Sequence, residues 1–154
     1  MHRTLKVSSV TAAIIATIAF TPPVAAQYAK PEDAVKYRKA AFTVMNSHMG
    51  RIFAQLKSSA PNMQVIQTSA NVVENMSKLP WDAFAPDTEF VRDTRALPSV
   101  YKNEDKIKEL ANRMQQEAAK LNAVAKGGDV KAVREQFGVL AKTCDNCHDD
   151  FRSK

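Results

Sequence analysis

Residues 130–151 read VKAVREQFGVLAKTCDNCHDDF and predict the last helix of the protein. Apolar residues recur in this stretch at spacings of three and four, which is the period of an amphipathic helix. The predicted inner face carries Val130, Val133, Phe137, Leu140, Ala141, Cys144, Cys147, His148 and Phe151. Because the cysteines and the histidine continue the apolar stripe, we expect their ligand to lie inside the protein core.

The pentapeptide Cys144-Asp145-Asn146-Cys147-His148 matches the C-x-x-C-H motif of covalent haem attachment. In such sites two thiols bond to the porphyrin and the histidine binds the iron. Positions i, i+3 and i+4 share one face of a helix, so the three side chains can reach one ring. We therefore predict one covalently bound haem c per chain, attached through Cys144 and Cys147, with His148 as an axial iron ligand.

Three other uses of this motif explain the sequence less well. A structural zinc site needs about four ligands, and the only other histidines are His2 and His48. A thioredoxin-like redox motif follows a strand and opens a helix, whereas this one lies deep in a helical pattern. A disulfide between Cys144 and Cys147 would leave His148 without a role.

Three further segments show helical patterns. The first begins at Lys30-Pro31-Glu32-Asp33 and ends near Ser58, the second covers about 63–78, and the third covers about 103–125, before Gly127-Gly128. Residues 79–102 contain three prolines and no sustained period, so they predict a long connection with at most a short helical turn. We predict an all-α protein, an antiparallel up-down four-helix bundle with one long connection between its second and third helices.

Residues 1–26 have the features of a secretory signal peptide: Arg3 and Lys6, then an apolar stretch, then Val24-Ala25-Ala26. Cleavage after Ala26 would leave a haem domain of residues 27–154 in the periplasm, with no membrane anchor. An uncleaved anchor is the alternative, although the apolar stretch is short for a membrane span.

The charge of the chain excludes one class of partner. Lys and Arg number 22 and Asp and Glu 16, for a net charge of +6. Cleavage would remove two basic residues and leave 20 against 16, a net charge of +4. No clustered basic stripe or nucleic-acid motif accompanies this charge, so we expect no nucleic-acid partner.

Arg38 lies within the apolar stripe of the first helix. A buried, unpaired charge costs several kcal/mol, so an anion should meet it. A haem propionate would suit its guanidinium; alternatively, the side chain extends to water. Lys39 beside it either assists or is an ordinary surface lysine.

The sixth iron ligand decides the class of haem protein. A methionine or histidine would make a low-spin electron carrier, and an open position a gas binder or a reactive centre. The candidate ligands are Met45, Met49, Met63, Met76, Met114 and His48. The residues alone leave both possibilities open.

Three stretches resemble cytochrome c′: Tyr37-Arg38-Lys39-Ala40-Ala41-Phe42, Leu79-Pro80-Trp81-Asp82-Ala83-Phe84, and Cys144 to His148 followed by Arg152. The resemblance extends from Gln27 to Lys154. It implies that Phe42 packs over the open distal face of a five-coordinate, high-spin iron and that Arg38 meets a propionate. It also implies that Arg152 lies on the proximal side and that the chain forms a homodimer through its first two helices. Lys39 stands where relatives commonly have a glutamine. Arg95 is also predicted to contact the haem, although the sequence around it differs from that of the relatives.

Phe42 offers neither a hydrogen-bond donor nor a base. Bound dioxygen and peroxide cleavage need such polar help, so we expect neither oxygen carriage nor an enzyme. Nitric oxide and carbon monoxide need less of it and could bind if Phe42 moves aside. We expect reversible binding of these gases, electron transfer to an unidentified redox partner, or both. A low-spin, methionine-ligated electron carrier is the alternative, and a subunit whose haem only stabilises the bundle is a third possibility.

Overall fold

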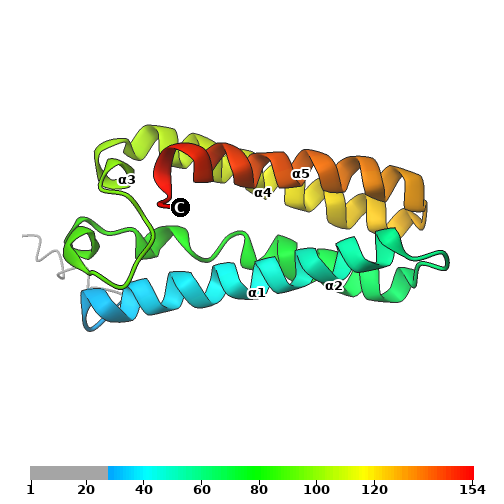
Figure 1. The fold of residues 1–154 in the computed structure, drawn as a ribbon, viewed down its shortest axis with the longest axis horizontal. Helices are drawn as coiled ribbons and strands as arrows, with labels where there is room; N and C mark the ends of the chain where they lie inside the picture. The colour runs from blue at the N-terminus through cyan, green and yellow to red at the C-terminus, as the bar shows by residue number, and fades with distance from the viewer. Residues whose placement is uncertain (1–27) are drawn as a thin grey trace, which may run out of the picture.

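The computed structural model describes residues 28–154, so the predicted signal peptide, Met1 to Ala26, lies outside the described residues. Within the described range four long helices run alternately up and down (Figure 1). They are α1 (Pro31–Lys57), α2 (Met63–Met76), α4 (Glu104–Gly127) and α5 (Val130–Phe151). The predicted antiparallel four-helix bundle is confirmed, with its long connection between α2 and α4.

Local signals account for most helix ends. Pro31 occupies the start of α1, where its missing N–H costs nothing. The side chain of Asn62 accepts a hydrogen bond from the N–H of Val65 at the start of α2. The side chain of Asp129 does the same for Lys131 and Ala132 at the start of α5. Gly128 ends α4 with φ of +79°, a left-handed conformation that favours glycine.

The apolar stripes of the four helices form one core. Its buried residues include Ile52 and Leu56 of α1, Ile66 of α2, Leu121 of α4 and Leu140 of α5. Helix α1 packs against α2, α2 against α4, and α4 against α5. Helices α1 and α5 meet at one end of the bundle, where the Phe53 and Phe137 rings stack with centroids 6.0 Å apart. Toward the other end these two helices diverge (Figure 1).

The connection between α2 and α4 lies at that divergent end (Figure 1). It contains two 3₁₀ turns, η1 (Trp81–Ala83) and η2 (Pro86–Phe90), and the short helix α3 (Ser99–Lys102). It therefore holds more helical structure than its prolines predict. Leu97 N–H donates to the carbonyl of Phe151 at 2.9 Å, and Ser153 N–H donates to that of Arg95 at 2.8 Å. These bonds place the connection against the end of α5.

No helix among residues 28–154 is long and apolar enough to cross a membrane.

Candidate haem-binding site

A cavity of about 960 Å³ is lined by all four long helices and the connection. All eight residues that the sequence nominates for haem contact line this cavity: Arg38, Lys39, Phe42, Arg95, Cys144, Cys147, His148 and Arg152. Its volume is at the upper end of the range of about 300–1,000 Å³ for small-molecule sites, which suits a porphyrin. The residues present therefore fit a haem group, although their individual roles remain predictions.

Helix α5 supplies the attachment wall of the cavity. Cys144 and Cys147 are half-buried free thiols one turn apart, not a disulfide. Burial raises the pKa of both thiols; the Asp145 carboxylate adds to this at Cys144, and Cys144 and then Asp150 add to it at Cys147. Both thiols therefore stay protonated at neutral pH. The described residues contain no group of three or more His, Cys, Asp and Glu that could hold a metal ion, so they offer no zinc site.

His148 is adjacent to this pair and lines the same cavity. Burial is the main cause that lowers the pKa of its imidazole, and the nearby Arg152 guanidinium lowers it further. The neutral ring is the form that binds iron. Nη1 of Arg152 lies 3.4 Å from Nδ1 of His148, one helical turn away. Histidine and arginine thus share one side of the cavity.

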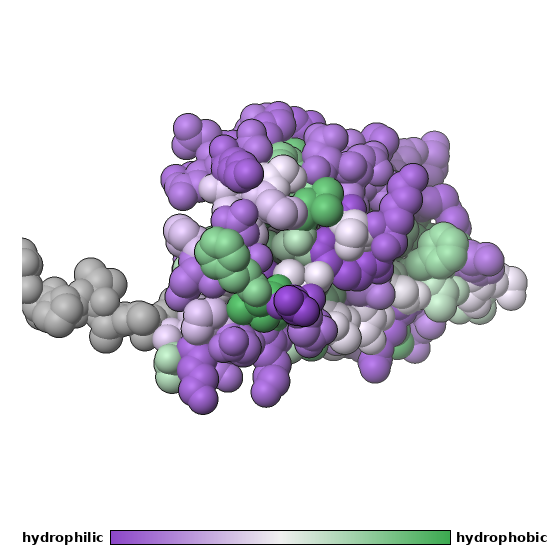
Figure 2. Space-filling view, turned by 60° about the vertical axis from the view of Figure 1, so that its left-hand side comes forward, coloured by the Kyte–Doolittle hydropathy of each residue, from purple (hydrophilic) through white to green (hydrophobic). Residues whose placement is uncertain are grey.

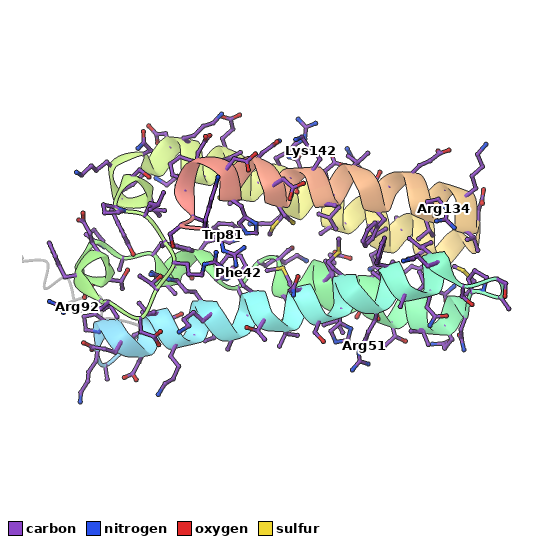
Figure 3. All side chains as sticks on the ribbon, viewed as in Figure 1. Phe42, Arg51, Trp81, Arg92, Arg134 and Lys142 are labelled. Atoms are coloured by element: carbon purple, nitrogen blue, oxygen red, sulfur yellow. The ribbon has the colours of Figure 1, made fainter. Side chains whose placement is uncertain are left out.

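The opposite wall is an aromatic cluster, made of Phe42, Trp81 and Phe84. The Phe42 ring meets Trp81 edge to face, with centroids 5.9 Å apart, and lies 6.3 Å from Phe84. Figure 3 shows Phe42 and Trp81 in the space between α1 and α5. The indole N–H of Trp81 donates to the carbonyl of Ser77 at 2.7 Å and is therefore not free for a ligand. The aromatic cluster consequently presents apolar surface to the cavity.

Comparisons with known proteins agree with this geometry. The family model described as cytochrome c′ matches residues 33–152. The chain belongs to the cytochrome c′ family. Its cofactor is accordingly covalently attached haem c.

Individual relatives cover nearly the whole described chain. The cytochrome c′ of Alcaligenes xylosoxydans is 40% identical over 129 residues, which is 83% of this chain and 99% of that protein. The crystal structure of cytochrome c′ from Rubrivivax gelatinosus has a TM-score of 0.78 at 34% identity and covers 82% of this chain and 100% of that one. A ferrous variant of the Alcaligenes xylosoxidans protein with bound nitric oxide has a TM-score of 0.76 at 38% identity, with 83% and 99% covered.

Arg38 is almost completely buried in this cytochrome c′, with 2% of its surface exposed, so the alternative that it reaches water is wrong. Its Nη1 donates to the carbonyl of Ala83 at 2.7 Å and to Thr88 Oγ1 at 2.8 Å. Its Nη2 donates to Thr94 Oγ1 at 3.1 Å and to the Tyr101 hydroxyl at 3.0 Å. The guanidinium also lies over the Phe84 ring, 4.4 Å from its centroid. The hydrogen bonds of Arg38 therefore hold the connection against α1. Its contact with a haem propionate remains a prediction.

No sequence pattern predicts Thr88, Thr94 or Tyr101 as partners of Arg38. They lie 50 to 63 residues further along the chain. A buried arginine signals that acceptors must exist, but its position does not say which residues of a non-periodic loop supply them.

Lys39 and Arg95 also have protein partners at the edge of the cavity. Lys39 Nζ forms an exposed ion pair with Asp93, 2.7 Å from Oδ2. Arg95 donates from Nε and Nη2 to the carbonyl oxygen of Ser153, at 3.1 and 2.7 Å. Both residues tie the connection to a long helix or its end, and their predicted haem contacts remain untested.

Several candidate sixth ligands lie away from the cavity. Among the six, Met45, Met49 and Met114 line it, whereas His48, Met63 and Met76 do not. The cavity-lining methionines keep the low-spin alternative open.

Seen from the divergent end, the surface of the described residues is mostly hydrophilic (Figure 2). Apolar side chains show among the hydrophilic ones near the middle of this view (Figure 2). The phenyl ring of Phe90, on η2, is 83% exposed. The connection thus carries apolar surface outward as well as toward the cavity.

Proposed function

We propose that this chain is a periplasmic c-type cytochrome with a five-coordinate, high-spin haem that reversibly binds nitric oxide and carbon monoxide and transfers electrons. A single observation carries the proposal: His148 and the two thiols form one wall of the cavity, and an aromatic cluster without a free donor forms the other. When bound, the haem supplies an iron that changes oxidation state and accepts a small ligand.

The residues of the chain would divide the remaining tasks. Cys144 and Cys147 attach the ring, and His148 holds the iron through its neutral imidazole. Phe42 restricts the distal face, so a gas must displace a phenyl ring that Trp81 and Phe84 support. Arg152 could donate a hydrogen bond to a small ligand that displaces His148. The aromatic cluster itself offers a ligand no free donor or base, which argues against oxygen carriage and against an enzyme.

Two properties of the relatives support the partners that we propose. One similar structure contains bound nitric oxide. Another, with a TM-score of 0.77 and 29% identity, is described as a cytochrome c′ with ligand-controlled dimer dissociation. We extend both to this chain: nitric oxide is its ligand, and it forms a homodimer through α1 and α2.

The second candidate is the low-spin electron carrier, which the cavity-lining Met45, Met49 and Met114 favour. Absorption and EPR spectra of the purified, haem-loaded protein at neutral pH separate the two. We expect a high-spin ferric signal and a new absorption spectrum on adding nitric oxide or carbon monoxide to the ferrous protein. A methionine–iron charge-transfer band, or a low-spin ferric signal, would favour the second candidate and rule out the open position.

A further inference from the structure

Residues 151–153 are held by a short backbone pairing with the connection. Leu97 N–H donates to the carbonyl of Phe151, and Ser153 N–H donates to that of Arg95. Between these bonds, Ala96 and Arg152 form an isolated antiparallel bridge. The pairing therefore brackets Arg152 on both sides.

Arg95 adds side-chain bonds to the same site. Its Nε and Nη2 both donate to the carbonyl oxygen of Ser153, at 3.1 and 2.7 Å. Its own carbonyl accepts from the N–H of Ser153 at 2.8 Å. Arg95 thus binds both polar backbone groups of the residue that follows Arg152.

The position of Arg152 makes this support necessary. Arg152 follows the last residue of α5 and has an extended backbone, with φ of −129° and ψ of 132°. Its side chain is exposed, and its Nη1 lies 3.4 Å from Nδ1 of His148. One helical hydrogen bond, from Arg152 N–H to the carbonyl of His148 at 3.2 Å, still reaches this residue. The pairing with residues 95–97 holds the backbone beyond it.

We propose that Arg95 is a positioning residue: it fixes the backbone of residues 152–153 and so keeps the Arg152 guanidinium beside His148. The inference rests on the proposed function, in which a small ligand meets Arg152 on this side of the haem. It differs from the sequence prediction that Arg95 contacts haem. The edge of its guanidinium formed by Nε and Nη2 is already occupied by Ser153.

The test compares three variants of the haem-loaded protein: Arg95→Gln, Arg95→Lys and, as a control, Lys102→Gln. Lys102 is an exposed basic residue of the same connection and does not line the cavity. The first readout is hydrogen exchange of the backbone amides in the peptide 149–154. The second is the rate at which the nitric oxide complex reaches its final spectrum, and the third is the rate of carbon monoxide binding.

In Arg95→Gln we expect about three- to tenfold faster exchange, because one or two net hydrogen bonds are lost. The nitric oxide rate should change in the same direction as in Arg152→Ala, and the carbon monoxide rate should not change. In Arg95→Lys the changes in exchange and in the nitric oxide rate should be smaller than in Arg95→Gln, because the lysine ammonium can still donate to Ser153. Lys102→Gln should resemble the wild type.

Other results would overturn the proposal. Faster exchange with an unchanged nitric oxide rate would make Arg95 a purely structural residue. Unchanged exchange with a changed nitric oxide rate would assign Arg95 to direct haem contact instead. Failure of the proposed function looks different, because the wild type itself would then give a low-spin spectrum or no nitric oxide complex.

Discussion

The rings of Phe42 and Trp81 pack edge to face at an interplanar angle of 85°, with centroids 5.9 Å apart. Edge-to-face aromatic pairs are favourable beyond the area that they bury. The indole is itself fixed to Ser77 by its N–H. Phe42 is therefore supported from behind, on the wall of the cavity that faces His148.

This support predicts the effect of Phe42→Ala on gas binding. If Phe42 guards the iron, its removal should speed carbon monoxide association by about tenfold or more, equivalent to lowering the barrier by about 1.4 kcal/mol. Trp81→Leu should have a smaller effect in the same direction, because Phe42 would then move aside more easily. Stopped-flow measurements on the ferrous protein test both. Phe90→Ala is the matched control, since Phe90 is exposed and outside the cavity lining; an unchanged rate in Phe42→Ala would mean that Phe42 does not guard the iron.

Arg152 gives a prediction for the other side of the haem. Its guanidinium lies beside His148, so Arg152→Ala should alter the nitric oxide complex more than the carbon monoxide complex. We expect a change of about tenfold in the nitric oxide kinetics, the size expected when a charge-assisted hydrogen bond of about 1.5 kcal/mol is lost. Stopped-flow absorption measurements of the formation of the two complexes give the rates, and EPR spectra characterise the nitric oxide complex. Lys142→Ala is the control, because Figure 3 shows Lys142 on the outer side of α5; equal effects on both gases would remove the proximal role of Arg152.

The four long helices could be predicted from sequence because their signals are local. The stripe from Val130 to Phe151 and the cap at Asp129 lie within one segment, and the structure begins and ends α5 at those residues. The same holds for Gly128, where the predicted break between helices has a positive φ. The attachment motif is equally local, since three residues on one helical face specify the chemistry.

The connection could not be predicted because its structure depends on distant residues. Thr94 accepts a hydrogen bond from Arg38, 56 residues earlier in the chain. Arg95 donates one to Ser153, 58 residues later. No period or turn motif in residues 79–102 indicates either pairing. The sequence leaves open whether Arg38 points inward or extends to water. Its burial and its neutral partners follow only from three-dimensional contacts.

The partners of Arg38 predict a large effect on stability. Replacing Arg38 by methionine removes four hydrogen bonds and leaves the Ala83 carbonyl and Thr88 Oγ1 without their donor. Thr94 Oγ1 and the Tyr101 hydroxyl still accept from Ala96 N–H and from Thr88. A buried acceptor that loses its donor costs about 1–3 kcal/mol, so the two together should cost about 2–6 kcal/mol. We expect the free energy of unfolding of the haem-loaded protein to fall by that amount, as measured by denaturant titration.

Lys39→Met is the control for this variant. Lys39 is adjacent on α1, and its ion pair with Asp93 is exposed, so its loss should cost less than about 1 kcal/mol. Similar losses in the two variants would show that the Arg38 bonds contribute no more than a surface pair.

Glu117 on α4 predicts how stability depends on pH. Only 4% of its side chain is exposed, and its carboxylate accepts from Gln136 of α5 at 2.8 Å and from Lys120 at 2.9 Å. Hydrogen bonds from Gln136 and then Lys120 lower the pKa of Glu117 below its ordinary value of 4.5, although burial opposes them. A carboxyl with a lowered pKa stabilises the folded state above its ordinary pKa, and this stabilisation is lost as the pH falls through the lowered value.

The free energy of unfolding of the wild type should therefore decrease on acidification below pH 4.5, the ordinary pKa of this group, and decrease less in Glu117→Gln. Denaturant titrations across that pH range measure how the free energy of unfolding of each protein changes with pH. These slopes are compared rather than the absolute stabilities, because glutamine also changes the bonds to Gln136 and Lys120. Glu109→Gln on the same helix is the control, since 69% of the Glu109 side chain is exposed. If the curve for Glu117→Gln ran parallel to that of the wild type, the charged carboxylate would contribute nothing to the packing of α4 against α5.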